Sequence, residues 1–265
     1  MEAGKVTVIT GASGGIGAAL ARELGKAGHR LVLAARRQEE LERVAREAAE
    51  NAVAVPTDVT RRDEVERLRD RAIEAFGRID VWINNAGRGI SKRVLELTDA
   101  DLDEMMTVNV KSALYGMQAV VPHFQQRGSG HLINVSSFLG RVPLVPIRSA
   151  YNAAKAALNA LTANLRVDLK AGYPGIHVSL VLPGIVTTEF ARNALGAATA
   201  ATAATAAGSA YRPPASAASP QTAEEVAAAI ARLVEHPQAE IFTNPAQVPI
   251  ARRYYEDIAA FEEQT

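Results

Sequence analysis

The sequence predicts a doubly wound α/β fold, with a parallel sheet of seven strands between two layers of helices in an α/β/α arrangement. Short, continuously apolar runs recur along the chain, and a stretch with helical periodicity separates each run from the next. Strands without polar alternation are buried on both faces. Strands that alternate with helices form right-handed crossovers in a parallel sheet.

The first half of the chain repeats the strand–helix unit three times and then adds a strand. Apolar runs of a few residues mark the strands, and amphipathic spacing marks the helices. We expect strands at 6–9, 31–34, 52–55 and 79–83, and helices at 16–27, 38–51 and 62–76.

The second half continues the alternation with longer helices. The same patterns predict strands at 132–135, 176–182 and 240–242, and helices at 99–108, 111–126, 150–171, 222–235 and 252–261.

Composition favours one domain spanning residues 1–265. The chain is 48% apolar and has a formal net charge of zero, whereas a nucleic-acid-binding protein usually carries a basic excess. The N-terminus lacks a signal-peptide pattern, and no apolar run is long enough to span a membrane. The chain has no Cys, and its five His residues show no ligand spacing. We expect a cytoplasmic protein with no metal site and no nucleic-acid or membrane partner.

Residues 189–220 interrupt the alternation with a low-complexity insertion. Residues 197–207 read AATAATAATAA and contain no large side chain, so they can bury little surface. Two interpretations remain open. The segment is either a mobile insertion or a lid over a substrate site, because it follows a strand end where ligands bind in such sheets.

A glycine-rich turn, TGASGGIG at residues 10–17, joins the first strand to the first helix. Glycines let the backbone turn tightly and approach a pyrophosphate, and the helix N-terminus offers free N–H groups. Glycines also serve ordinary turns, but a position between strand and helix favours dinucleotide binding. The expected contacts are Gly11, Ser13, Gly15, Ile16 and Gly17.

The second strand ends in Ala34-Ala35-Arg36-Arg37. NAD-binding sheets place an acidic residue here for the ribose hydroxyl, whereas arginine suits the 2′-phosphate of NADP. The sequence therefore favours NADP(H) over NAD(H), with Arg36 as the main phosphate ligand and Arg37 as a second one. The alternative is that both are solvated residues at a helix start.

Polar residues also follow the third and fourth strands, where the cofactor of such a sheet lies. Asp58 is placed either to bind the adenine amino group or to cap the next helix. Asn84 and Asn85 are expected to brace the cofactor loop through backbone hydrogen bonds. The remaining expected contacts in these two segments are Val59, Ala86 and Gly87.

Tyr151 and Lys155 are one helical turn apart and therefore share a helix face. A free phenol has a pKa of about 10 and transfers protons poorly at neutral pH. A nearby ammonium group lowers that pKa, and a shift toward 7 requires about 4 kcal/mol. This pair alone is only suggestive of an acid/base site.

Two further strand ends carry candidate site residues. Ser136 and Ser137 end the fifth strand, where a hydroxyl can hold a substrate carbonyl oxygen beside the phenol. The turn Pro183-Gly184 after the sixth strand lets the chain pass close to a flat ring, and Thr188 is placed to bond a carboxamide.

Together these motifs resemble the short-chain dehydrogenase/reductase family, in its single-domain, Rossmann-type branch. The matching pieces are TGASGGIG, DV, NNAG, the Asn of Val108-Asn109-Val110, Ser-Ser, YNAAK and PGIVTT. They follow the family's order from Thr10 to Thr188, about three-quarters of the chain from its start.

The resemblance implies a role for each matching residue. Tyr151 is the acid/base, Lys155 lowers its pKa and binds the nicotinamide ribose, Ser137 orients the substrate oxygen, and Asn109 holds a water in a proton relay. The family's cofactor contacts fall on Gly11, Gly15, Gly17, Asp58, Asn85 and Thr188, with Arg36 at the position typical of NADP-preferring members.

The sequence departs from the family pattern in three places. Ser137 and Tyr151 are slightly further apart than is usual, and the adjacent Ser136 leaves the choice of serine open. Gly14 stands where a larger residue is common, and the Ala/Thr tract has no counterpart that we can match.

The resemblance implies an NADP-dependent oxidoreductase that interconverts a ketone or aldehyde with an alcohol by hydride transfer. The alternative is a catalytically silent NADP-binding sensor or partner protein, which would not need the Ser/Tyr/Lys/Asn set. A homodimer or homotetramer is implied, through the helices at 111–126 and 150–171. The identity of the substrate is left open. The expected walls of its pocket are the segments 88–94, 138–148 and 185–195. Four arginines in these walls either bind an acidic group or are solvated: Arg88, Arg141, Arg148 and Arg192.

Overall fold

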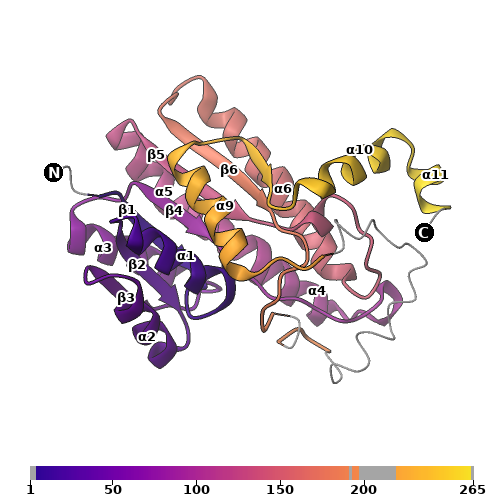
Figure 1. Cartoon of the computed structure of the whole chain (residues 1–265), viewed down its shortest axis with the longest axis horizontal. Coiled ribbons are helices and arrows are strands. Elements are labelled where there is room, and N and C mark those ends of the chain that lie inside the picture. The colour runs from indigo at the N-terminus through magenta and orange to yellow at the C-terminus, as the bar shows by residue number, and fades with distance from the viewer. Residues whose placement is uncertain (1–3, 191–192, 197–218, 264–265) are drawn as a thin grey trace.

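The sheet organises the computed structural model, which describes residues 4–190, 193–196 and 219–263. Its seven strands are all parallel, in the order β3-β2-β1-β4-β5-β6-β7 (Figure 1). The order reverses between β1 and β4, and ligands of such sheets bind in the crevice at that point. The strands are β1 (Val6–Thr10), β2 (Arg30–Ala35), β3 (Ala52–Pro56), β4 (Val81–Asn84), β5 (Gly130–Val135), β6 (Ile176–Leu182) and β7 (Glu240–Phe242).

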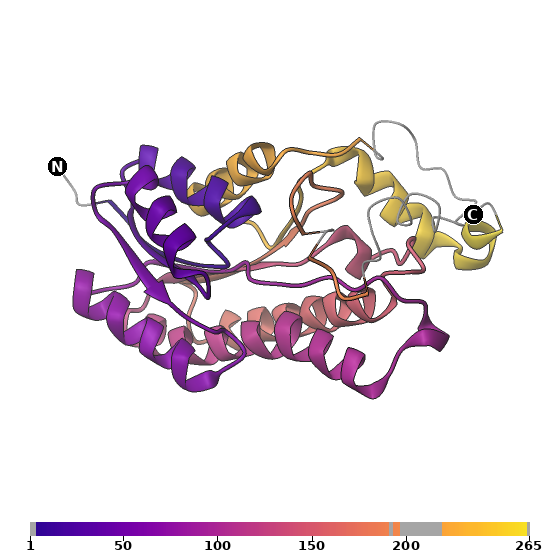
Figure 2. The same cartoon turned by 90° about the horizontal axis from the view of Figure 1, so that it is seen from below.

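Helices cover both faces of the sheet, as the fold class predicted (Figure 2). One layer contains α1 (Gly15–Lys26), α2 (Gln38–Ala48) and α9 (Ala223–Glu235). The other contains α3 (Arg62–Phe76), α4 (Asp99–Met106), α5 (Ser112–Arg127) and α6 (Ser149–Lys170). The C-terminal α10 (Val248–Glu256) and α11 (Ile258–Glu262) extend beyond the end of the sheet (Figure 1).

Burial on both faces explains why the strands have no polar alternation. Successive side chains point to opposite faces, and Ile9 packs with α1, α2 and α9 whereas its neighbour Val8 packs with α3, α5 and α6. Trp82 and Ile83 divide in the same way. Each strand therefore contributes to two apolar layers.

The structure corrects the predicted helices at two places. The stretches at 99–108 and 111–126 are joined by a π-helical turn, Thr107–Lys111, so that α4 and α5 follow each other without a loop. The helix predicted at 252–261 is two helices, because Asp257 adopts an extended conformation and its side chain caps α11 by accepting from Ala260 N. Both differences arise from local hydrogen bonding, which apolar spacing does not reveal.

The insertion predicted at 189–220 is described only in part. Residues 191–192 and 197–218, including the tract at 197–207, lie outside the described residues. Its flanks are held by backbone hydrogen bonds: Gln221 pairs with Ile185 and Thr187, and Leu195 with Gly89 and Ser91. Within the described ranges, we find no helix with the length and apolar character needed to cross a membrane.

Candidate functional site

Ser137, Tyr151 and Lys155 come together where β5 ends and α6 begins. The Tyr151 hydroxyl is hydrogen-bonded to Ser137, whose Oγ also accepts from Leu139 N at 3.1 Å. Lys155 follows one turn later on α6, and its Nζ donates to the carbonyl oxygen of Val135 at 3.0 Å. All three side chains are buried. The strand end thus fixes the hydroxyl, and the helix fixes the phenol and the amine.

The geometry distinguishes the two adjacent serines. Ser136 Oγ donates to Asn159 Oδ1 at 2.5 Å and lies 3.3 Å from the Lys155 carbonyl oxygen, so it ties the strand to α6. Ser137 faces Tyr151 instead. Of the two, Ser137 is the one placed to orient a substrate oxygen.

The ionisation of the pair differs from the sequence-based expectation. Burial raises the pKa of Tyr151 to about 12, although the bond to Ser137 and the charge of Arg148 oppose it. Burial also lowers the pKa of Lys155 to about 8. The Lys155 Nζ lies 5.7 Å from the centre of the Tyr151 ring and donates to Val135, not to the phenol. The prediction of an acidic phenol is therefore wrong for the protein by itself: Tyr151 is a protonated donor at neutral pH.

Asn109 reaches the same site from the π-helical turn between α4 and α5. Its amide Nδ2 donates to Arg88 O at 2.9 Å and Met105 O at 3.1 Å, while Oδ1 accepts from Arg88 N at 3.2 Å. A Cβ built on Gly87 would lie 2.9 Å from Asn109 Oδ1 and 3.5 Å from Lys155 Nζ, so the three meet. π-helical turns often occur at functional sites. The water relay itself remains a prediction.

The glycine turn gives α1 an N-terminus suited to an anion. Gly11 and Gly15 adopt φ values of 67° and 52°, which favour glycine. Among the described residues, no side chain caps α1 and no acidic residue stands in its first turn, so its N–H groups are free to bind a pyrophosphate. Ile16 packs against the core, and Thr188 lies 3.4 Å from a Cβ built on Gly15. These residues fit a dinucleotide.

Asn85 braces the glycine turn, whereas Asn84 does not. Asn85 Nδ2 donates to Thr10 O at 2.9 Å, and Thr10 Oγ1 accepts from the backbone N–H groups of Asn85 and Ala86 at 3.0 and 3.1 Å. Asn84 instead accepts from Trp82 Nε1 and donates to Asn134 inside the α3/α5/α6 layer. Sequence reasoning missed Thr10 as a brace, although it precedes the glycines directly.

The two arginines after β2 differ in their partners. Arg37 donates to Ser13 O and Oγ at 3.2 Å each and lies 3.5 Å from Glu40, so it is held beside the glycine turn. Arg36 is exposed and forms no ion pair with a described residue, and no acidic residue replaces it at the end of β2. Arg36 is therefore the freer of the two to bind a phosphate.

Asp58 does not cap α3, which overturns one of the two roles considered for it. The N-cap of α3 is Arg61, and Asp58 Oδ1 accepts from Thr60 N at 3.0 Å and Thr60 Oγ1 at 2.7 Å. Those bonds and the charges of Arg36 and Arg61 hold the pKa of Asp58 below its usual value despite burial. Val59 packs against the apolar layer of α3 and α5. Adenine contact by Asp58 remains a prediction.

The Pro183-Gly184 turn is supported by a residue far away in the sequence. Pro183 O accepts from Phe138 N at 2.8 Å. A Cβ built on Gly184 would lie 2.3 Å from Gln247 Nε2, so the buried Gln247 amide packs directly on the turn. Nothing in the sequence pattern links positions 184 and 247. This contact was therefore not predicted.

The three segments expected to form the substrate walls lie side by side. Lys92 N donates to Ile147 O at 2.8 Å, and Ser91 N donates to Leu195 O at 2.7 Å. Phe190 places its ring 5.5 Å from the ring of Tyr151, centre to centre. The segments at 88–94, 138–148 and 185–195 thus meet beside the phenol.

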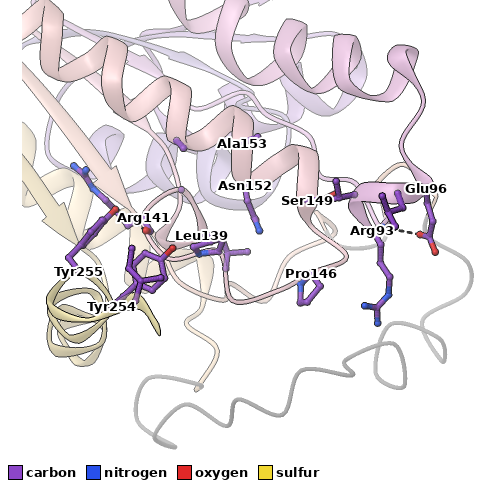
Figure 3. A pocket seen from close by; sticks show the side chains of 16 residues that line it. Arg93, Glu96, Leu139, Arg141, Pro146, Ser149, Asn152, Ala153, Tyr254 and Tyr255 are labelled. Carbon is purple, nitrogen blue, oxygen red and sulfur yellow. Dashed lines mark hydrogen bonds between the residues drawn. The ribbon is translucent and has the colours of Figure 1, made fainter. Parts of the chain in front are cut away.

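A separate hollow of about 960 Å³ is bordered by the 139–149 loop. Figure 3 shows Asn152, Leu139 and Pro146 bordering it below α6, with Tyr254 and Tyr255 at one end and Arg93 at the other. None of the four candidate catalytic side chains lines it. Nor do the described residues gather three metal-ligating side chains at any place.

Comparison with known proteins identifies the family. The sequence model of the short chain dehydrogenase family matches residues 5–199 of this chain. An oxidoreductase of Staphylococcus saprophyticus is 41% identical over 187 residues, which cover 70% of this chain and 75% of that protein.

Solved structures agree with this match. A short chain dehydrogenase/reductase from Burkholderia phymatum in complex with NAD has a TM-score of 0.83 and 30% identity, and the match covers 97% of this chain and 95% of the other. An alcohol dehydrogenase from Thermococcus sibiricus complexed with 5-hydroxy-NADP has a TM-score of 0.74 and 29% identity, and the match covers 90% and 95%. With its seven-stranded Rossmann-type sheet, this chain belongs to the short-chain dehydrogenase/reductase family of oxidoreductases.

Proposed function

We propose that the protein is an NADP-dependent oxidoreductase that interconverts a ketone or aldehyde with an alcohol. The observation that carries this proposal is the convergence of Ser137, Tyr151 and Lys155 beside an uncapped helix N-terminus at the reversal of strand order. The bound dinucleotide supplies the hydride. The chain supplies the binding surface, the orientation and the proton.

The proton step follows from the ionisation of Tyr151. Because burial keeps the phenol protonated, the hydroxyl can donate to the oxygen of a carbonyl that Ser137 orients. In the oxidative direction the same oxygen accepts the proton. Lys155, with its pKa lowered to about 8, is still mainly an ammonium group at pH 7 and stabilises negative charge on the phenol oxygen.

The test of the chemistry is the variant Tyr151→Phe. It removes the transferable proton and keeps the ring, so we expect NADPH binding within threefold of the unchanged protein and a loss of turnover of at least about a hundredfold, the lower end for general acid–base catalysis. The assay is loss of NADPH absorbance with a panel of aldehydes and ketones. Undiminished reduction by the variant would remove Tyr151 from the mechanism.

The same panel distinguishes an enzyme from a silent binding protein. A sensor or partner protein would bind NADPH and reduce nothing in the panel. The complete Ser137, Tyr151, Lys155 and Asn109 set supports the enzyme, since binding alone does not require it.

NADP preference rests on the end of β2. Ala35 is small and neutral, and Arg36 is exposed and unpaired among the described residues. We expect the double variant Ala35→Asp, Arg36→Ala to shift the ratio of kcat/KM from NADPH toward NADH by at least about tenfold, since charge-assisted hydrogen bonds contribute roughly 1.5–3 kcal/mol. Arg37→Ala should change that ratio less. An unchanged ratio in the double variant would show that the phosphate is bound elsewhere.

We also propose a cytoplasmic homodimer or homotetramer. Ala153, Ala156 and Ala160 form an exposed stripe of small residues on α6, whereas Ala154 is buried in the core. Light scattering during size-exclusion chromatography measures the assembly directly, and a monomer at micromolar concentration would refute it.

A further inference from the structure

The four arginines considered for an acidic group differ in whether a carboxylate neutralises them. Arg88 is paired with Glu104, and Arg141 is paired with Glu240. Arg192 lies outside the described residues. Arg148 forms no ion pair with any residue that the structure describes; its hydrogen bonds go to Ile90 O at 2.8 Å and Ser91 Oγ at 3.1 Å, both from Nη1.

Arg148 lies beside the phenol at the start of α6. A Cβ built on Gly89 would meet both Arg148 Nη1, at 3.2 Å, and the Phe190 ring, at 2.9 Å, and that ring contacts Tyr151. The guanidinium is only partly buried. Its charge acts on the pKa of Tyr151, which shows that the two groups are close. A ligand at the phenol is therefore near this cation.

The free edge of the guanidinium matches an anion. Nε and Nη2 have no hydrogen-bond partner among the described residues, and they form the edge that binds a carboxylate bidentately. The N-terminal end of α6, directly after Arg148, adds positive potential. A partly buried charge without a partner is unfavourable. A bound anion would remove that penalty.

The undescribed part of the insertion offers no substitute for such an anion. Residues 191–192 and 197–218 contain neither Asp nor Glu, so the part of the insertion that is not described brings no carboxylate side chain. Lys92, the next cation along this wall, is already paired with Asp101.

We propose that Arg148 binds a carboxylate on the substrate, and that the substrates are oxo acids and the corresponding hydroxy acids. This inference rests on the proposed function. In reduction, the carbonyl carbon gains a hydride from NADPH and the carbonyl oxygen gains the proton of Tyr151. The products are the hydroxy acid and NADP⁺, Tyr151 regains a proton from water, and the carboxylate is unchanged.

The spacing limits how far the carboxylate is from the carbonyl. Residues three apart on a helix have Cβ atoms about 5–6 Å from each other. Arg148 is the N-cap of α6, and Tyr151 lies three residues further along the chain. A short oxo acid, with two to four carbons linking the carboxylate to the reacting carbonyl, spans that interval.

Arg148 also links the 88–94 wall to α6, so the test must separate charge from bracing. The bond to Ile90 O needs only an N–H donor, which glutamine retains. Arg148→Gln removes the charge and the bidentate edge. Arg141→Gln is the matched control, since Arg141 stands on the same wall but is already paired with Glu240.

The experiment compares each acid with its methyl ester. We would measure kcat/KM with NADPH for 4-oxopentanoate and 5-oxohexanoate and for their methyl esters, at pH 7 and low salt. The unchanged protein should prefer each acid. Arg148→Gln should lower kcat/KM for the acids by about 10- to 100-fold, as expected for lost charge-assisted hydrogen bonds, and change the esters by less than threefold. Arg141→Gln should leave the acid-to-ester ratio unchanged.

Each other outcome counts against the inference. Equal losses for acid and ester would show a bracing role alone, and a preference of the unchanged protein for esters would overturn the carboxylate site. Should Arg148→Gln fail to fold, Arg148→Lys and the salt dependence of the acid-to-ester ratio in the unchanged protein test the same claim. If the panel of aldehydes and ketones is reduced in a Tyr151-dependent way but no acid is preferred, the inference fails while the proposed function stands. If nothing is reduced, the proposed function fails first.

Discussion

Gly17 is the position at which one methyl group should test the cofactor turn most directly. It lies in the first turn of α1. A Cβ built there would be 2.4 Å from the carbonyl oxygen of Gly11 and 2.7 Å from Asn85 Nδ2, whereas nonbonded carbon contacts are normally about 3.5–4.0 Å. The Gly17→Ala variant must therefore move α1 away from the turn by roughly 1 Å.

The cost can be worked out from these contacts. Overpacking of this kind lowers the free energy of unfolding by about 1–3 kcal/mol, whereas the higher helix propensity of Ala over Gly raises it by about 1 kcal/mol. Loss of the Asn85 hydrogen bonds to Thr10 O and Gly11 O adds about 0.5–1.5 kcal/mol. Together these contributions should lower the free energy of unfolding by about 0.5–3.5 kcal/mol. We expect NADPH affinity to fall at least about tenfold, because the free N–H groups of α1 are displaced.

Urea unfolding and a fluorescence titration with NADPH measure the two effects separately. Gly172→Ala is the control, because a Cβ there would meet nothing within 4 Å and the residue is not left-handed. The control should change stability by less than about 0.5 kcal/mol and leave NADPH affinity unchanged. If Gly17→Ala behaved like Gly172→Ala in both measurements, the close packing of the turn would not matter for cofactor binding.

Three other predictions concern neighbouring residues. Ser137→Ala should reduce kcat by at least about tenfold with little change in stability. Ser136→Ala should lower the free energy of unfolding by about 1 kcal/mol with a smaller effect on kcat, because Ser136 forms its hydrogen bonds within the fold. Activity assays and urea unfolding measure both effects, and the reverse pattern would show that Ser136, not Ser137, orients the substrate. Thr10→Val leaves the N–H groups of Asn85 and Ala86 without an acceptor, so unfolding by urea should show a loss of about 1–3 kcal/mol, and a loss under 0.5 kcal/mol would contradict the bracing role. Because the pKa of Lys155 is lowered to about 8, the ammonium form disappears as pH rises through that value, and kcat/KM for reduction should decline there. The residual activity of Lys155→Arg should not show this decline. If the variant declined over the same pH range, the titrating group would be a residue other than Lys155.

The fold followed from periodicity because each element occupies a uniform environment. Arg62–Phe76 was predicted with its observed bounds, since charged and apolar residues alternate regularly along it. The helix from residue 38 ends at Ala48, three residues before the prediction, because Ala49 is already extended. The alanine and asparagine residues there are only weak signals of a helix C-terminus, so the sequence did not predict where the helix ends.

The site was predictable where function depends on short spacing and not where it depends on contacts distant in sequence. Tyr151 and Lys155 share a face because four residues make about one turn of helix. The raised pKa of Tyr151 was not predictable, since it depends on how completely the walls cover the phenol. Likewise, Asn84 reads like Asn85 in the sequence. Only the structure shows that it joins Trp82 and Asn134 in a buried polar network with Thr162.

The position of Asn109 depends on the one extra residue in the π-helical turn at Thr107–Lys111. Each residue of an α-helix advances by about 100°, so a turn with one extra residue leaves α4 and α5 out of phase by that angle. Deleting a single residue there would let the two run on as one ordinary helix, with the sheet packing of α5 preserved. Asn109 would then swing away from Gly87 and Lys155. A shortened chain could thus keep the sheet packing of α5 while its candidate site loses a member, which makes the length of this segment as informative as its composition.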